Sequence, residues 1–142
     1  MTRRPKDIGT AYATSVTRWL QANGWADAER LPQYGNRDRG DLMICRSPIV
    51  VAECKAGNAA EVASPAVIDE WLDECFVERN NAAAVLCPLI VYRYRRPLAN
   101  NDVWLPLSHL TWLDTGTFGG SGIPVRMSLA DFSDLLRTAV GR

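Results

Sequence analysis

The chain has 142 residues, 47% of them hydrophobic, and a formal net charge of zero. This length suits one domain that buries about two-thirds of its unfolded surface, so we expect a single domain over residues 1–142. The longest apolar run, Ala82 to Tyr92, contains Pro88 and falls short of the roughly 20 apolar residues that a membrane-spanning helix needs. No apolar stretch follows the charged N-terminus, so no secretory signal is expected. These features predict a soluble cytoplasmic protein without a membrane partner.

Zero net charge argues weakly against a nucleic-acid-binding protein, because such proteins usually carry an excess of Lys and Arg. The charges are unevenly distributed, however. Residues 1–60 hold nine Lys or Arg and six acidic residues, and residues 81–100 hold three Arg and no acid. Residues 61–80 hold six acidic residues and one Arg. This pattern is compatible with a basic face that contacts an anionic polymer.

The cysteines indicate a reducing environment. They are Cys45, Cys54, Cys75 and Cys87. Their spacing is too wide for a CxxC-type zinc site, and the single His109 does not complete one. We therefore expect reduced and mostly buried thiols. A nucleophilic role for Cys54 is disfavoured, because alternation along a strand turns its side chain away from those of Glu53 and Lys55.

The first elements in chain order are a helix and a hairpin. Apolar residues recur at helical spacing from Ile8 to Gln21, and Asn23-Gly24 supplies a stop. A short strand is expected at Ala28 to Leu31, followed by a polar, basic loop at Pro32 to Arg39. Two β-prone runs, Asp41 to Cys45 and Ile49 to Cys54, are separated by only three residues and predict two antiparallel neighbours.

The next element is an acidic amphipathic helix that begins at Pro65, with Ser64 as its N-cap. Its apolar stripe should be buried, leaving its acidic residues mostly towards solvent or a partner. The stripe comprises Val67, Ile68, Trp71, Leu72, Cys75 and Phe76, and the acidic residues are Asp69, Glu70, Asp73, Glu74 and Glu78.

The second half of the chain predicts a long strand at Ala83 to Tyr94 that begins buried and ends exposed, and a short strand at Val103 to Leu105. A brief helix at Leu107 to Leu113, a flexible loop at Thr115 to Pro124 and a last helix at Ser128 to Val140 should follow. The order predicts an α/β sandwich with an αβββαβ core, in which a mixed sheet is flanked by helices and residues 115–142 are a C-terminal addition.

Three charged residues should converge at the end of the hairpin. Glu53 and Lys55 share one face of their strand, and the hairpin partner can place Asp41 opposite them. Carboxylates are the hard oxygen ligands that Mg²⁺ takes, so Asp41 and Glu53 are candidate ligands, together with the backbone carbonyl of Cys54. A bound metal would activate a water and neutralise developing charge on a phosphate.

The role of Lys55 stays open at this point. It could orient or deprotonate the attacking water, or it could pair with the phosphate. A nearby cation and desolvation favour loss of its proton, whereas the two carboxylates oppose it. The structural alternative is a surface ion pair, since Glu and Lys two residues apart are common on exposed strands. The apolar run Ile49 to Ala52 opposes that alternative, because it indicates a buried strand that ends in charged residues.

The succession of a first helix, RDRGD at 37–41, VVAECK at 50–55 and an acidic helix resembles the PD-(D/E)xK nuclease superfamily. Within it, the chain is most similar to Holliday junction resolvase-like endonucleases of archaea and bacteriophages, over about residues 8–114. The resemblance implies a restriction-endonuclease-like fold, with Asp41, Glu53 and Lys55 as catalytic residues and Mg²⁺ or Mn²⁺ as cofactor. It also implies a homodimer that acts on branched DNA, in the host cytoplasm if the protein is phage-encoded.

One feature departs from that family. Such resolvases usually carry a glutamate in the first helix that assists the metal site, and the corresponding position here is read as Ala13. Either the remaining ligands bind the metal with weaker activity, or catalysis has been lost.

Two groups of arginines are candidate contacts to the DNA backbone. Arg37 and Arg39 precede Asp41, and Arg93, Arg95 and Arg96 alternate with tyrosines. Their alternative interpretation is a solvated loop and an exposed strand end.

Three functions therefore remain open. The first is a junction-resolving endonuclease, and the second is another repair or restriction-like nuclease with the same site. The third is a catalytically weakened DNA-binding module on a nuclease scaffold.

Overall fold

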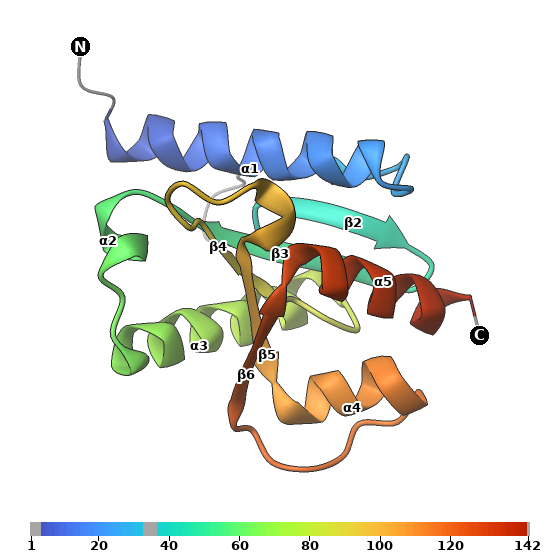
Figure 1. Ribbon diagram of the computed structural model, residues 1–142. Coiled ribbons are helices and arrows are strands. Elements are labelled where there is room, and N and C mark those ends of the chain that lie inside the picture. The colour runs from blue at the N-terminus through green and yellow to red at the C-terminus, as the bar shows by residue number, and fades with distance from the viewer. Residues whose placement is uncertain (1–3, 33–36, 142) are drawn as a thin grey trace.

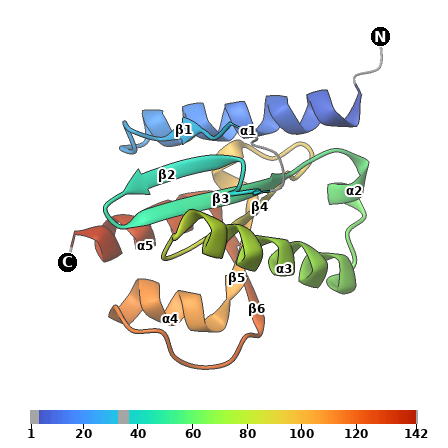
Figure 2. The ribbon, with the colours of Figure 1, turned by 180° about the vertical axis from the view of Figure 1, so that it is seen from behind.

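The computed structural model describes residues 4–32 and 37–141. Its strands form one six-stranded sheet in sequence order, in which β3 and β4 are parallel and all other neighbours are antiparallel. In Figures 1 and 2, α1 runs along one face of β2 and β3, and α3 runs along the other. The elements are α1 (Pro5–Ala22), β1 (Glu29–Arg30), β2 (Leu42–Arg46), β3 (Ile49–Lys55), α2 (Asn58–Glu61), α3 (Pro65–Ala82), β4 (Leu89–Val91), η1 (Leu98–Asn100), β5 (Asp102–Pro106), α4 (Leu107–Thr115), β6 (Pro124–Ser128) and α5 (Leu129–Val140).

The predicted α/β class with a mixed sheet between helices is confirmed, and so is the first half of the element order. The expected first helix is α1, and β2 pairs with β3 as an antiparallel hairpin, with Leu42 opposite Ala52. The predicted first strand is β1, which is only two residues long. The loop expected at Pro32 to Arg39 lies partly outside the described residues.

Helix α3 begins as predicted, because Ser64 Oγ accepts a hydrogen bond from the Val67 amide at 3.3 Å. The predicted orientation of its faces is only partly correct. Ile68 and Cys75 are buried, but Phe76 is 56% exposed and Glu78 is only 3% exposed. Since Glu78 follows Cys75 by three residues, it lies on the same face of the helix as the buried positions. The acidic residue at 78 therefore faces the sheet, which corrects the prediction that it faces solvent.

The long strand predicted at Ala83 to Tyr94 is confirmed only over Leu89–Val91, which is the whole extent of the regular strand. Helix α3 extends to Ala82 and ends on Ala83 in the left-handed conformation. Pro88 has no amide proton for a ladder hydrogen bond, so regular pairing starts only after it. Residues 92 and 93 have no regular structure and residues 94–95 form a turn, in place of the expected alternating strand end, and Arg95 has a positive φ of 61°.

The C-terminal segment is part of the sheet and of the core, contrary to its description as an addition. Strand β6 pairs antiparallel with β5 over its whole length. Helix α5 then begins as predicted, because Ser128 Oγ accepts a hydrogen bond from the Asp131 amide at 3.1 Å. Its residues Leu129, Phe132 and Leu136 are completely buried. None of the described helices has the length and apolar composition needed to cross a bilayer.

Side-chain alternation along β3 separates two cores. Val50, Ala52 and Cys54 lie in the larger core, which also holds residues of α1 and α5. Val51 lies in the smaller core, together with Ile68 and Cys75 of α3. Glu53 has the same parity as Val51, so the strand presents it towards α3.

Candidate functional site

The hairpin brings Asp41 against the end of β3. Asp41 donates its amide to the carbonyl of Ala52 at 2.9 Å, and its Oδ2 accepts a hydrogen bond from the amide of Cys54 at 2.8 Å. Gly40 makes this approach possible, because its φ is +97° and an added Cβ would lie 3.0 Å from the Ala52 carbonyl oxygen. The Gly-Asp dipeptide thus fixes the Asp41 carboxylate beside the peptide bond between Glu53 and Cys54.

Glu53 is the buried centre of the site. It is 7% exposed, and its Oε2 has no hydrogen-bond partner among the described residues. Burial, together with the neighbouring carboxyl groups of Glu78 and Asp41, raises the pKa of Glu53 far above its ordinary value. Glu53 therefore retains its proton at neutral pH unless a cation balances its charge.

Glu78 and Asp38 complete a cluster of carboxyl groups that the sequence analysis did not identify. One oxygen each of Asp38, Glu53 and Glu78 lie within 4.8 Å of one another. Burial and the charges of Asp38, Asp41 and Glu74 raise the pKa of Glu78 to about 7. The helical spacing of Glu78 from Ile68 and Cys75 was the available signal, because it places an acid on a buried stripe. We call Asp38, Asp41, Glu53 and Glu78 the carboxylate cluster.

Lys55 forms an ion pair with Glu74 of α3, an acid outside the predicted set of Asp41, Glu53 and Lys55. Its Nζ lies 2.9 Å from Glu74 Oε2 and 5.4 Å from the centre of the Trp71 ring. Burial disfavours the charged ammonium, but Glu74, Glu53 and Asp41 outweigh that effect and raise the pKa of Lys55. Lys55 is thus a cation at neutral pH, which favours a charge-pairing or orienting role over that of a base.

A hollow of about 330 Å³ opens beside Asp41 and Glu53, between the hairpin and α1. Arg30, for which the sequence predicted no role, lines this hollow. The Arg30 side chain donates to the carbonyls of Asp41 and Thr10 at 3.2 and 3.0 Å and to Thr14 Oγ1 at 2.9 Å. The lining residues are Lys6, Gly9, Thr10, Arg30, Asp41, Glu53 and Cys54. Cationic groups and carboxyl groups therefore share one hollow.

Ala13, the position that corresponds to the missing glutamate of the first helix, does not line this hollow. Ala13 is 2% exposed and lies in the larger core. The residues of α1 that line the hollow are Lys6, Gly9 and Thr10. Among the described residues it is Glu78 of α3, and not a residue of α1, that adds a further buried carboxyl group to Glu53.

Cys54 contributes its backbone and not its thiol. Its amide donates to Asp41, and its side chain lies in the larger core with Tyr12 and Ala52. Burial and the charges of Asp41 and Glu53 raise the pKa of the Cys54 thiol well above its ordinary value. A thiolate nucleophile is accordingly disfavoured, as the alternation along the strand predicted.

The five predicted DNA-contacting arginines differ in their surroundings. Arg37 and Arg96 are exposed, and Arg39 is half-buried. Arg93 Nε lies 3.5 Å from Oδ2 of the buried Asp102, so part of its charge is already balanced within the fold. The Arg95 guanidinium lies 5.2 Å from the centre of the Tyr94 ring.

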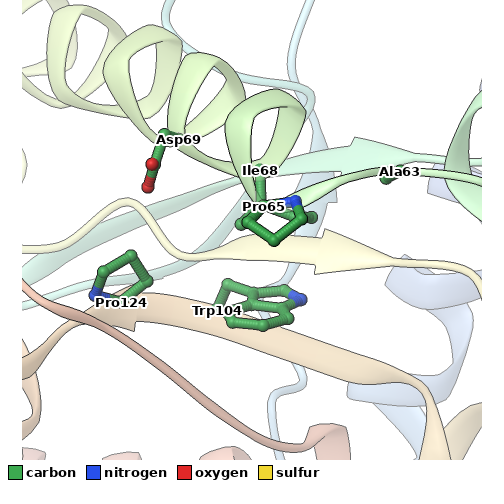
Figure 3. A pocket seen from close by; sticks show the side chains of 6 residues that line it. All are labelled: Ala63, Pro65, Ile68, Asp69, Trp104 and Pro124. Atoms are coloured by element: carbon green, nitrogen blue, oxygen red, sulfur yellow. The ribbon is translucent and has the colours of Figure 1, made fainter.

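A second hollow, of about 320 Å³, is mainly apolar (Figure 3). It lies between the start of α3 and strands β5 and β6. Its lining residues are Ala63, Pro65, Ile68, Asp69, Trp104 and Pro124. None of them belongs to the carboxylate cluster, and Asp69 is its single charged lining residue among those described. The first hollow is therefore the better candidate for chemistry.

Comparisons of the chain with protein-family models, with curated proteins and with solved structures give no match.

Proposed function

We propose that the protein is a metal-dependent endonuclease that hydrolyses phosphodiester bonds of DNA. The observation that carries the proposal is the crowding of carboxyl groups around Glu53, whose buried Oε2 has no hydrogen-bond partner in the part of the chain that the structure describes. Several carboxyl groups within a few ångströms repel one another when ionised, so the cluster either retains protons or takes a cation that balances its charge.

The side chains fit Mg²⁺ or Mn²⁺. Both ions take hard oxygen ligands, and Asp41, Glu53 and Glu78 would supply them, with Asp38 at the exposed side and the Cys54 carbonyl as a backbone candidate. A bound ion supplies an activated water and a positive charge for the phosphate.

The chain's own cations suit a phosphate ester. Lys6 and Arg30 line the hollow beside the carboxylate cluster, where they can bind phosphate oxygens on either side of the reacting group. Lys55 carries a positive charge next to Glu53 and can orient the attacking water or stabilise the developing negative charge. Arg37 and Arg96, which are exposed, are proposed to contact the DNA backbone further away.

The finer proposal is a homodimeric Holliday junction resolvase with a restriction-endonuclease-like fold. It rests on the resemblance of RDRGD and VVAECK to that superfamily. A two-fold dimer would hold two sites at a fixed separation, as a junction with two symmetry-related strands requires. A related repair or restriction-like nuclease is the alternative with the same chemistry.

A specific observation favours a non-catalytic module as the second candidate. Lys55 is held by Glu74 at 2.9 Å and is therefore not free to reach a substrate without giving up that ion pair. In such a module, the carboxylate cluster would bind a cation and the arginines would bind DNA, with no cleavage.

Cleavage assays separate these candidates. Purified protein is incubated with labelled four-way junction, flap and linear duplex DNA, in chelator, in Mg²⁺ and in Mn²⁺. We expect metal-dependent cleavage that is fastest on the junction. Equal rates on junction and linear duplex would favour the repair or restriction-like nuclease. Binding of DNA without cleavage of any substrate in either metal would reject the endonuclease and favour the module.

A further inference from the structure

Two cysteines and a glutamate meet in the interior where α3 packs against the segment that leads into β4. Cys75 and Glu78 are separated by one turn of α3, and Cys87 lies two residues before Leu89. The three residues are 3%, 3% and 4% exposed, respectively. The two Sγ atoms and one carboxylate oxygen of Glu78 lie within 4.8 Å of one another. The fold thus joins two cysteines that are too far apart in the sequence for a recognisable zinc motif.

These three groups offer one another few hydrogen bonds. Cys87 Sγ donates to Glu78 Oε2 over 3.8 Å, a long contact from a weak donor. An ionised carboxylate buried with thiols and other carboxyl groups as its polar neighbours is costly to the fold unless a cation accompanies it. Ordinary core packing does not require this combination, because an apolar side chain at position 78 would fill the same space.

We propose that Cys75, Glu78 and Cys87 bind a thiophilic divalent cation, with Zn²⁺ as the expected ion, at a site that adjoins the hard-ligand site at Glu53 and shares Glu78 with it. The spacing fits, because Zn–S bonds of about 2.3 Å and Zn–O bonds of about 2.1 Å in a tetrahedral site put the donor atoms roughly 3.5–3.8 Å apart. Sulfur ligands select Zn²⁺ or Cd²⁺ over Mg²⁺. Binding forms two metal–sulfur bonds and one metal–oxygen bond, and it releases to solvent the two thiol protons together with the Glu78 proton where that carboxyl group is protonated.

The structure has room for a fourth ligand. A cavity of about 20 Å³ adjoins both cysteines and is also lined by Arg79 and His109. This volume holds about one water molecule. Burial and the charge of Arg79 lower the pKa of His109 to about 4, so its ring is neutral at physiological pH. A water can thus occupy the fourth position beside the neutral ring of His109, as three-ligand zinc sites allow.

The proposed zinc site shares one residue with the carboxylate cluster. A Glu78 oxygen also lies within 4.8 Å of oxygens of Asp38 and Glu53. A zinc ion that takes Glu78 therefore changes which carboxyl groups surround Glu53. Zinc binding by the two thiols and Glu78 does not require that the protein cleave DNA.

Cadmium provides a direct probe, because a thiolate bound to Cd²⁺ absorbs ultraviolet light by charge transfer. Reduced, metal-free full-length protein is titrated with Cd²⁺. We expect an absorption that saturates at one ion per chain, is removed by Zn²⁺ and is insensitive to Mg²⁺. Cys75→Ser and Cys87→Ser should each weaken binding by at least about tenfold, since even loss of an outer-shell partner has that effect. Cys45→Ser is the matched control and should bind as the parent does.

A second measurement uses the unmodified chain, so it does not depend on how the variants fold. Alkylation of each cysteine is followed by mass spectrometry in mild urea, with and without Zn²⁺. At a Zn²⁺ concentration ten times the Kd, labelling of Cys75 and Cys87 should slow by about tenfold, while labelling of Cys45 should not change. Equal labelling of Cys75 and Cys87 with and without Zn²⁺, or a cadmium absorption that persists in both serine variants, would overturn the proposal.

Discussion

The two faces of β3 are similarly buried, but they differ in chemistry where the strand ends. Cys54 and Glu53 are 6% and 7% exposed, yet Cys54 lies among apolar side chains while Glu53 lies among carboxyl groups. Burial of Val50 and Ala52 towards α1 stabilises the fold through the hydrophobic effect. Burial of Glu53 towards α3 opposes folding, because a carboxyl group is desolvated there without a full set of partners. On the α3 side, burial of Val51 also stabilises the fold, so the cost on that face is confined to Glu53 and its neighbouring carboxyl groups, and the proposed metal site would explain it.

The largest expected effect is on cleavage. Glu53→Gln keeps the shape of the side chain and removes its charge, so it should lower the cleavage rate by about a hundredfold to a thousandfold. The same change should stabilise the metal-free protein by on the order of 2 kcal/mol at neutral pH, because folding no longer has to protonate a buried carboxylate. Rates come from labelled DNA and stabilities from urea unfolding. Glu70→Gln, at an exposed position of α3, is the control. Loss of stability together with unchanged cleavage would reverse the roles of the two faces.

The apolar face should respond in the opposite way. Val50→Ala removes two methyl groups from a completely buried position and should cost about 2 kcal/mol of unfolding free energy. Cleavage per folded molecule should stay within about twofold of the parent, since Val50 is absent from the lining of the hollow. Val62→Ala, at a residue that is 80% exposed, should change stability by less than about 0.5 kcal/mol. A large loss of activity in folded Val50→Ala would show that the faces are not separable.

A smaller effect concerns pH. The folded-state pKa of Glu78 is about 7, above the ordinary value of 4.5, so the folded protein holds this proton more tightly than the unfolded chain does. Its contribution to stability therefore falls as pH rises between these two values and is constant above them.

Urea unfolding in chelator at pH about 5 and about 8 tests this effect. Relative to Glu78→Gln, the parent should lose on the order of 1–2 kcal/mol between the two pH values. The comparison with the variant cancels the contribution of His109, which titrates in an overlapping range. Saturating Mn²⁺ should remove the loss, because the metal binds the ionised carboxylate. A parent and variant with parallel pH dependence would place Glu78 outside the coupled cluster.

The smallest effect concerns the ion pair of Lys55. Glu74 is half-exposed, so Glu74→Gln should change stability by less than about 1 kcal/mol. Loss of this carboxylate lowers the pKa of Lys55, because Glu74 is one of the groups that raise it. If Lys55 acts as a cation, the decline of cleavage at alkaline pH should begin at lower pH in the variant. An identical pH–rate profile would remove Lys55 from the reaction.

The parts of the structure that depend on neighbouring residues could be predicted from the sequence. The hairpin follows from two apolar runs and a short turn, and strand alternation then places Asp41 beside the end of β3. The N-caps at Ser64 and Ser128 are equally local, because each hydroxyl bonds an amide three residues ahead.

The remaining features depend on long-range packing. Strand β6 is short and weakly patterned, and its conformation is determined by pairing with β5. Glu78 and Arg30 reach the site because α3 and β1 pack against the hairpin. The helical spacing of Glu78 indicates that it is buried, but no local pattern indicates that it lies beside Glu53. The strand expected up to Tyr94 ends early, because Pro88 delays regular pairing and the chain turns after Val91.

Binding of Mn²⁺ tests most directly whether the charged face of β3 is a metal site. Metal-free protein and Glu53→Gln are titrated with Mn²⁺ in a calorimeter under identical conditions. We predict that the parent binds Mn²⁺ and that the variant binds it at least about tenfold more weakly, because its buried carboxylate ligand is lost. Equal binding by both proteins, or no binding by the parent, would contradict the assignment of Glu53 and its neighbouring carboxyl groups as a divalent-metal site.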